Sequence, residues 1–106
     1  MLFRSSGAAS TFLATEIECS RLLTYDVAAK VDAAPDALFP REASMAKLKA
    51  TETAKKMTLE GMQMMGGYGY ATEYEMERYV RSALVTTIFG GTNEIQREII
   101  GRTYGL

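Results

Sequence analysis

Histidine and tryptophan are absent from the 106 residues, and Cys19 is the only cysteine. Without histidine, Ser-His and Cys-His nucleophilic pairs and histidine-bound metals are excluded. A lone cysteine forms neither an internal disulfide nor a thiolate metal site, so we predict no metal centre. We expect Cys19 to be a small buried residue. Any acid–base chemistry falls to carboxylates, lysines or tyrosines.

An excess of either charge is also missing, because 12 basic and 13 acidic residues give a formal net charge of −1. The two signs are interspersed, which gives no electrostatic basis for binding nucleic acid or an anionic membrane surface. No apolar run approaches the roughly 20 residues that span a bilayer. The opening residues lack the apolar stretch of a signal peptide and the arginines of a transit peptide. We therefore expect a cytoplasmic protein with no nucleic-acid or membrane partner.

Helical periodicity is what the sequence does contain, first over residues 9–34. At about 100° per residue, apolar residues gather on one face of this segment. Ser10 can cap its start, and Pro35 cannot continue it. Residues 35–40 then form a short connection, which favours an antiparallel neighbour. The expected inner face consists of Leu13, Ile17, Thr24, Val27, Ala28 and Val31.

The second predicted helix, residues 41–65, has only a narrow polar strip and is apolar over most of its circumference. Such a helix is normally covered by several neighbours. Lys47 lies inside the apolar arc, where it is either a buried functional lysine or one whose stem lies along the helix with the ammonium group in solvent. We favour the second. The second helix therefore predicts more protein around it than two further short helices supply.

The C-terminal third is punctuated by glycines. Gly66 or Gly67 can terminate the second helix, and residues 73–83 predict a short amphipathic helix. Residues 84–89 are apolar and β-branched, but no second strand exists to pair with them. We interpret them as a buried extended or helix-terminal segment. Thr92 then caps a last helix, with Glu94 in its first turn.

Together these segments predict an all-α fold, an antiparallel up-down bundle of four helices. Two glycine-rich stretches, residues 63–70 and 90–94, end one helix and begin another. Glycine lets a backbone approach a ligand closely, and a helix N-terminus offers free N–H groups. From the pattern alone, helix punctuation is the simpler interpretation.

Residues 43–70, 77–81 and 88–97 together resemble the acyl-CoA dehydrogenase family, in the order and spacing of its C-terminal helical domain. The resemblance implies an FAD-dependent enzyme that converts an acyl-CoA thioester to its trans-2-enoyl form. A base removes the α-proton while the β-hydrogen passes as hydride to the flavin. It further implies a dimer or tetramer, and a domain at residues 1–106 that follows N-terminal helical and middle β domains, so that the chain is truncated on its N-terminal side.

The resemblance also implies roles for individual residues near both glycine stretches. Thr92, Asn93 and Glu94 match the segment at the flavin's own site, and Phe89 and Gly91 flank the substrate. The segment that meets the FAD of a neighbouring subunit is matched by Gln63, Met64, Met65, Gly66 and Gly67.

Gly90 is the main departure from the family pattern. Many members place a catalytic glutamate at this position, directly before the Gly-Thr pair, and a glycine cannot abstract a proton. In other branches the glutamate comes from an earlier helix, which would lie upstream of this chain, as would the Arg-x-x-Phe-Gly element that contacts FAD. We therefore predict no catalytic residue here, and weak or no FAD binding by the chain alone.

Three functions remain open at this point. The first is the C-terminal domain of an FAD-dependent acyl-CoA dehydrogenase. The second is a non-catalytic helical module that oligomerises or docks on a partner, suggested by the broad apolar surface of residues 41–65. The third is a heteromeric enzyme in which a separate chain brings the base.

Overall fold

The computed structural model describes residues 2–106, with side chains described for residues 7, 8 and 10–106. This part of the chain is helical and contains no strand. The elements are α1 (Leu2–Ala33), α2 (Pro40–Met65), α3 (Gly67–Tyr70), α4 (Met76–Thr86) and α5 (Asn93–Thr103).

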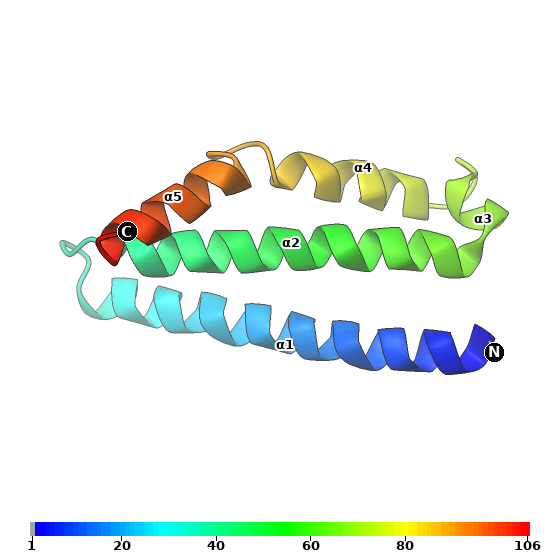
Figure 1. The fold of residues 1–106 in the computed structure, drawn as a ribbon, viewed down its shortest axis with the longest axis horizontal. Helices are drawn as coiled ribbons and strands as arrows, with labels where there is room; N and C mark the ends of the chain where they lie inside the picture. Colours follow the sequence, from blue (N-terminus) through cyan, green and yellow to red (C-terminus); the bar gives the residue numbers. More distant parts are fainter. Residues whose placement is uncertain (1) are drawn as a thin grey trace.

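α2 is the central helix of the molecule (Figure 1). α1 packs along one side of it in the opposite direction, and α4 and α5 follow one another along another side. The predicted all-α, antiparallel up-down fold is confirmed, with α4 and α5 sharing one row. The result is an elongated body of 48 × 28 × 25 Å, whose length is set by α1 and α2.

The ends of α2 follow from its sequence. Pro40 stands in its first turn, where a missing N–H costs nothing because that group has no intrahelical acceptor. At the other end Gly66 adopts φ +63°, and its N–H donates to the Gln63 carbonyl at 3.2 Å. α3 follows at once, and its buried Gly69 lies against the Met62 backbone. This four-residue helix was not predicted.

Other details differ from the sequence-based expectations. α1 begins at Leu2, so Ser10 lies inside the helix and does not cap it. α4 extends to Thr86, which confirms a helix-terminal segment, but Ile88 and Phe89 are 62% and 56% exposed and not buried. Cys19 is exposed as well. These apolar positions face outward because the three rows of helices have no further layer to cover them.

The core is correspondingly small. Leu13 and Val27 of α1 and Val80 and Ala83 of α4 are the buried apolar residues of the described part. Large apolar side chains elsewhere stay exposed, among them Phe12, Leu22, Val31, Met57, Leu59, Met64 and Met65. The neighbours predicted for α2 are therefore supplied in part by α1, α4 and α5. None of the described helices combines the length and the apolarity needed to cross a membrane.

Candidate functional site

The two glycine segments lie at different places along α2. The start of α5 contacts the first half of α2, at Lys47 and Thr51, whereas Gln63 to Gly67 lie at the C-terminal end of the helix. About 1.5 Å per residue separates them by roughly 20 Å along α2. The fold therefore does not bring the two predicted segments into one site within a single chain.

The loop before α5, residues 89–92, is shaped by its two glycines. Gly90 and Gly91 adopt φ +65° and +87°, in the left-handed region that other residues rarely enter. The Gln96 side-chain amide donates to the Gly90 carbonyl at 3.1 Å and to the Gly91 carbonyl at 3.2 Å. The Asn93 N–H closes the loop on the Thr87 carbonyl at 3.0 Å. Both glycine carbonyls are thereby turned toward the protein.

The outward side of this loop carries free hydrogen-bond donors. The described peptide bonds are trans, so each N–H points away from the carbonyl of the same peptide unit. The inward carbonyls of Gly90 and Gly91 therefore direct the N–H groups of Gly91 and Thr92 outward, and no described residue accepts a bond from them. The Thr92 hydroxyl caps α5 by accepting from the Ile95 N–H at 3.3 Å, as predicted. Exposed Glu94 follows in the first turn. Such an end can bind an anion or a ring carbonyl.

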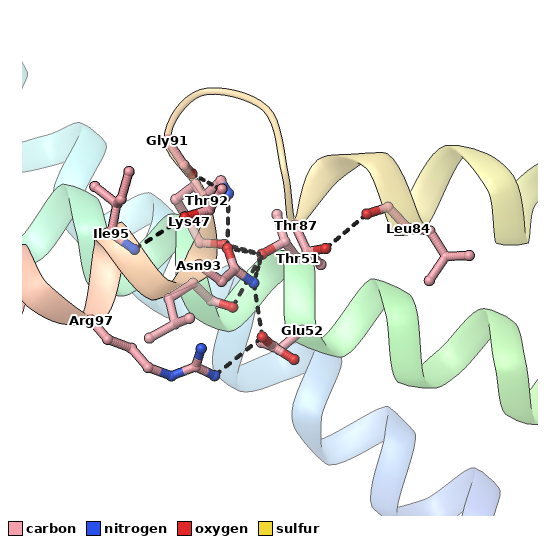
Figure 2. Close-up of polar contacts among 11 residues, drawn as sticks. Lys47, Thr51, Glu52, Leu84, Thr87, Gly91, Thr92, Asn93, Ile95 and Arg97 are labelled. Carbon is pink, nitrogen blue, oxygen red and sulfur yellow. Dashed lines mark hydrogen bonds and ion pairs between the residues drawn. The ribbon is translucent and has the colours of Figure 1, made fainter.

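Lys47 corrects the sequence prediction for its side chain. Its ammonium group does not extend into solvent but donates to the Gly91 carbonyl at 3.0 Å and to Asn93 Oδ1 at 2.8 Å (Figure 2). The reason lies in the tertiary structure, because the loop and α5 place two oxygen acceptors within hydrogen-bond distance of Lys47. Lys47 thus joins α2 to the glycine loop.

Asn93 is the most buried functional candidate, with 2% of its surface exposed. Its side-chain NH2 donates to Thr51 Oγ1 at 3.1 Å and to Glu52 Oε1 at 2.8 Å, while its oxygen accepts from Lys47. Arg97 completes the network by an ion pair with Glu52 at 3.2 Å. The Asn93 side chain is therefore fully occupied within the protein, and its main-chain N–H is occupied by the Thr87 carbonyl.

Four further residues belong to this site that were not expected from the sequence: Thr51, Glu52, Gln96 and Arg97. One available signal was the spacing of Lys47 and Thr51, which are four residues apart and so share a face of α2. No comparable signal connects α2 with α5, because their contacts join residues more than 40 positions apart.

The second glycine segment is a surface feature at the far end of α2. Gln63, Met64, Met65, Gly66 and Gly67 are all exposed. Beyond them, the rings of Tyr68 and Tyr74 meet edge to face with centroids 5.6 Å apart. These two rings, with Gly67, Ala71 and Glu73, line a surface hollow of about 480 Å³.

Glu52 gives the network a pH dependence. The hydrogen bond from Asn93, and then Arg97, hold the pKa of Glu52 below its ordinary value. The carboxylate therefore stabilises the fold above the unfolded-state pKa, and this contribution is lost as the pH falls through the lower folded-state pKa. We expect Glu52→Gln to be less stable than the parent near neutral pH, with a difference that shrinks in acid.

Urea unfolding of both proteins across the acidic range, followed by circular dichroism, measures this difference. Glu60→Gln is the matched control on the same helix, since Glu60 forms no ion pair with a described residue. A stability gap for Glu52→Gln that stays constant with pH would contradict the assignment.

Comparison with known proteins finds relatives of this chain by sequence. Residues 10–105 match the family model described as the acyl-CoA dehydrogenase C-terminal domain. Cyclohex-1-ene-1-carbonyl-CoA dehydrogenase of Syntrophus aciditrophicus is 44% identical over 86% of this chain and 22% of its own length. The mitochondrial short-chain specific acyl-CoA dehydrogenase of Rattus norvegicus is 43% identical over 83% of this chain and 21% of its own. The chain thus spans about a fifth of these relatives.

Solved structures of acyl-CoA dehydrogenases share the fold. Butyryl-CoA dehydrogenase from Megasphaera elsdenii superposes with a TM-score of 0.89 at 35% identity, over 98% of this chain and 27% of that one. The acyl-CoA dehydrogenase of Geobacillus kaustophilus gives a TM-score of 0.79 at 42% identity, over 88% and 24%. By sequence and by fold, this chain belongs to the acyl-CoA dehydrogenase family and corresponds to its C-terminal helical domain.

Proposed function

We propose that this chain contributes the C-terminal part of an FAD-dependent acyl-CoA dehydrogenase that acts on acyl-CoA thioesters, and that it presents FAD-facing surfaces without supplying the base. The observation that carries the proposal is the pair of glycine segments beside α2, within a chain of this family. One lies against the first half of the helix, at Lys47 and Thr51, and the other is exposed at its C-terminal end. Their separation along α2 suits contacts with two different FAD molecules in an oligomer, as the resemblance implies.

The residues present fit such a cofactor in different ways. The outward N–H groups of Gly91 and Thr92 suit an anionic or carbonyl oxygen, and Glu94 borders them. Exposed Gln63 to Gly67 offer a side-chain amide and close backbone approach, with Gly66 in the left-handed region. When bound, FAD supplies the hydride acceptor. Exposed Phe89 and the glycine loop would then border the acyl thioester.

We assign the catalytic base to no residue of this chain. Gly90 has no side chain, and the nearest carboxylate in sequence, Glu94, lies in the first turn of α5. A carboxylate from another domain or chain would have to remove the α-proton.

We also propose a cytoplasmic location. Some relatives are named as mitochondrial, so cell fractionation is the measurement that tests it.

A domain exchange tests the cofactor assignment. In an acyl-CoA dehydrogenase whose own base stands at the position of Gly90, the C-terminal domain is replaced by this chain. The chimera is expected to retain FAD, while the chain alone is expected to retain little or none. Flavin absorbance after gel filtration measures both. A folded chimera that loses FAD would contradict the proposal, and so would stoichiometric FAD on the chain alone.

The exposed apolar side chains favour one alternative, a non-catalytic module that assembles with copies of itself. Phe12, Leu22 and Tyr25 of α1 are 48%, 58% and 63% exposed, on a chain with a small core. Where such side chains form a contiguous patch, the patch usually marks a contact with other protein. Two measurements together distinguish the candidates: light scattering of the purified chain and FAD retention by the chimera. A chain that forms a discrete dimer or tetramer, combined with a chimera that holds no FAD, would favour the module.

A further inference from the structure

Lys47 has a role that the family assignment does not explain. It shares a face of α2 with Thr51, and its ammonium group is divided between a main-chain oxygen, that of Gly91, and a side-chain oxygen, that of Asn93. Hydrogen bonds from a charged donor are stronger than those between neutral groups. One cation therefore holds the end of the glycine loop and the first residue of α5 together.

The glycine loop needs such a support, because its two glycines give it more conformational freedom than any other residue type would. A Cβ built at Gly90 would meet no atom within 4 Å, so side-chain packing does not restrict the loop there. Gln96 also binds the loop carbonyls, but Gln96 belongs to α5 and moves with it. Lys47 belongs to α2 and fixes the loop relative to the central helix.

We propose that Lys47 is a positioning residue that orients the glycine loop. By holding the Gly91 carbonyl inward, it directs the N–H of Thr92, in the same peptide unit, to the outer surface. The consequence for FAD rests on the proposed function, whereas the effect on the loop is a property of the chain itself. The two statements are tested separately.

Native-state hydrogen exchange of the isolated chain tests the effect on the loop. The probe is the Asn93 amide, which is protected by the Thr87 carbonyl. In Lys47→Met, which keeps an apolar stem but loses the donors, the Asn93 amide should exchange roughly tenfold faster or more. The Val80 amide of α4 is the reference for opening of the whole fold. Lys55→Met, eight residues further along α2, is the matched control.

The decisive quantity is the exchange rate of Asn93 relative to that of Val80. A rise of this ratio in Lys47→Met alone supports the proposal. Equal acceleration of both amides would reduce Lys47 to general stabilisation and overturn it. Should Lys47→Met fail to fold, the parent chain provides the test, because nuclear Overhauser contacts from the Lys47 side chain to Gly91 and Asn93 are expected. Their absence would overturn the proposal.

The chimera described above tests the consequence for the cofactor. Lys47→Met is expected to weaken FAD retention there about tenfold, and Lys55→Met is expected to leave it unchanged. Faster exchange at Asn93 with unchanged FAD retention would show that Lys47 orders a loop that FAD does not contact, which overturns the cofactor consequence. Failure of the unsubstituted chimera to hold FAD would instead count against the proposed function.

Discussion

Gly90→Glu is expected to create proton abstraction where the parent chain has none. In the FAD-retaining chimera, the unsubstituted chain should leave acyl-CoA unoxidised, and the glutamate should raise turnover by roughly 100-fold or more, the usual contribution of a positioned general base. The reason is positional, because the resemblance to the family implies that Gly90 stands where many members carry this carboxylate. Reduction of an artificial electron acceptor in the presence of acyl-CoA measures the rate.

The geometry of the loop sets the cost of this substitution. A Cβ at Gly90 meets no atom within 4 Å, so a glutamate has room to extend from the exposed loop. Its φ of +65° strains any residue with a Cβ, at a cost of about 1–2 kcal/mol. We therefore expect the gain in turnover to be accompanied by a modest loss of stability.

Gly90→Gln is the matched control, since it imposes the same strain and size without a base. Turnover in the glutamine variant equal to that of the glutamate variant would contradict the assignment of the position. Turnover in the unsubstituted chimera would show that another carboxylate already serves as the base. A glutamate variant that retains FAD but stays inactive would show that the loop does not direct this position toward the substrate.

Gly69→Ala is expected to produce the largest loss of stability among single alanine substitutions at the glycines. A Cβ at this buried glycine would lie 2.7 Å from the Met62 carbonyl oxygen and 3.0 Å from the Met62 Cα. Both atoms belong to the backbone of α2 and cannot rotate away. α3 must therefore move off α2, and we expect a cost of about 3 kcal/mol. Urea unfolding followed by circular dichroism measures it.

Gly67→Ala provides the matched control two residues away. A Cβ there meets nothing within 4 Å, and Gly67 lies in the same short helix without a positive φ. Alanine favours helices over glycine by up to about 1 kcal/mol, so this variant should be as stable as the parent or slightly more. Equal unfolding midpoints for the two alanine variants would show that α3 does not depend on contact between Gly69 and α2.

The loss of α3 should also be visible locally. Tyr68 of α3 meets Tyr74 edge to face, and this contact depends on the position of α3 beside the end of α2. The chemical shifts of the two rings, measured by nuclear magnetic resonance, are therefore expected to change in Gly69→Ala and to remain unchanged in Gly67→Ala. The surface hollow lined by these two rings borders the exposed residues at the end of α2. FAD retention by the chimera is therefore also expected to fall in Gly69→Ala.

The sequence by itself determined the long helices, the glycine breaks and the Thr92 cap, because each depends on residues close together in the chain. It also determined the family, through the order and spacing of several motifs. It missed α3, since four residues that include two glycines have little intrinsic tendency to form a helix. Contact with Met62 stabilises that helix instead. The sequence also wrongly predicted burial of residues 84–89, because apolar character does not reveal whether a neighbour is present to cover it.

The candidate site shows the same division. Gly90 and Gly91 could be identified as a break between helices, since their freedom of φ is a property of glycine alone, and both adopt a positive φ. The position of the Lys47 ammonium could not, because its acceptors on Gly91 and Asn93 lie 44 and 46 residues further along the chain. Only the packing of α5 on α2 places those oxygens within hydrogen-bond distance of the Lys47 ammonium group.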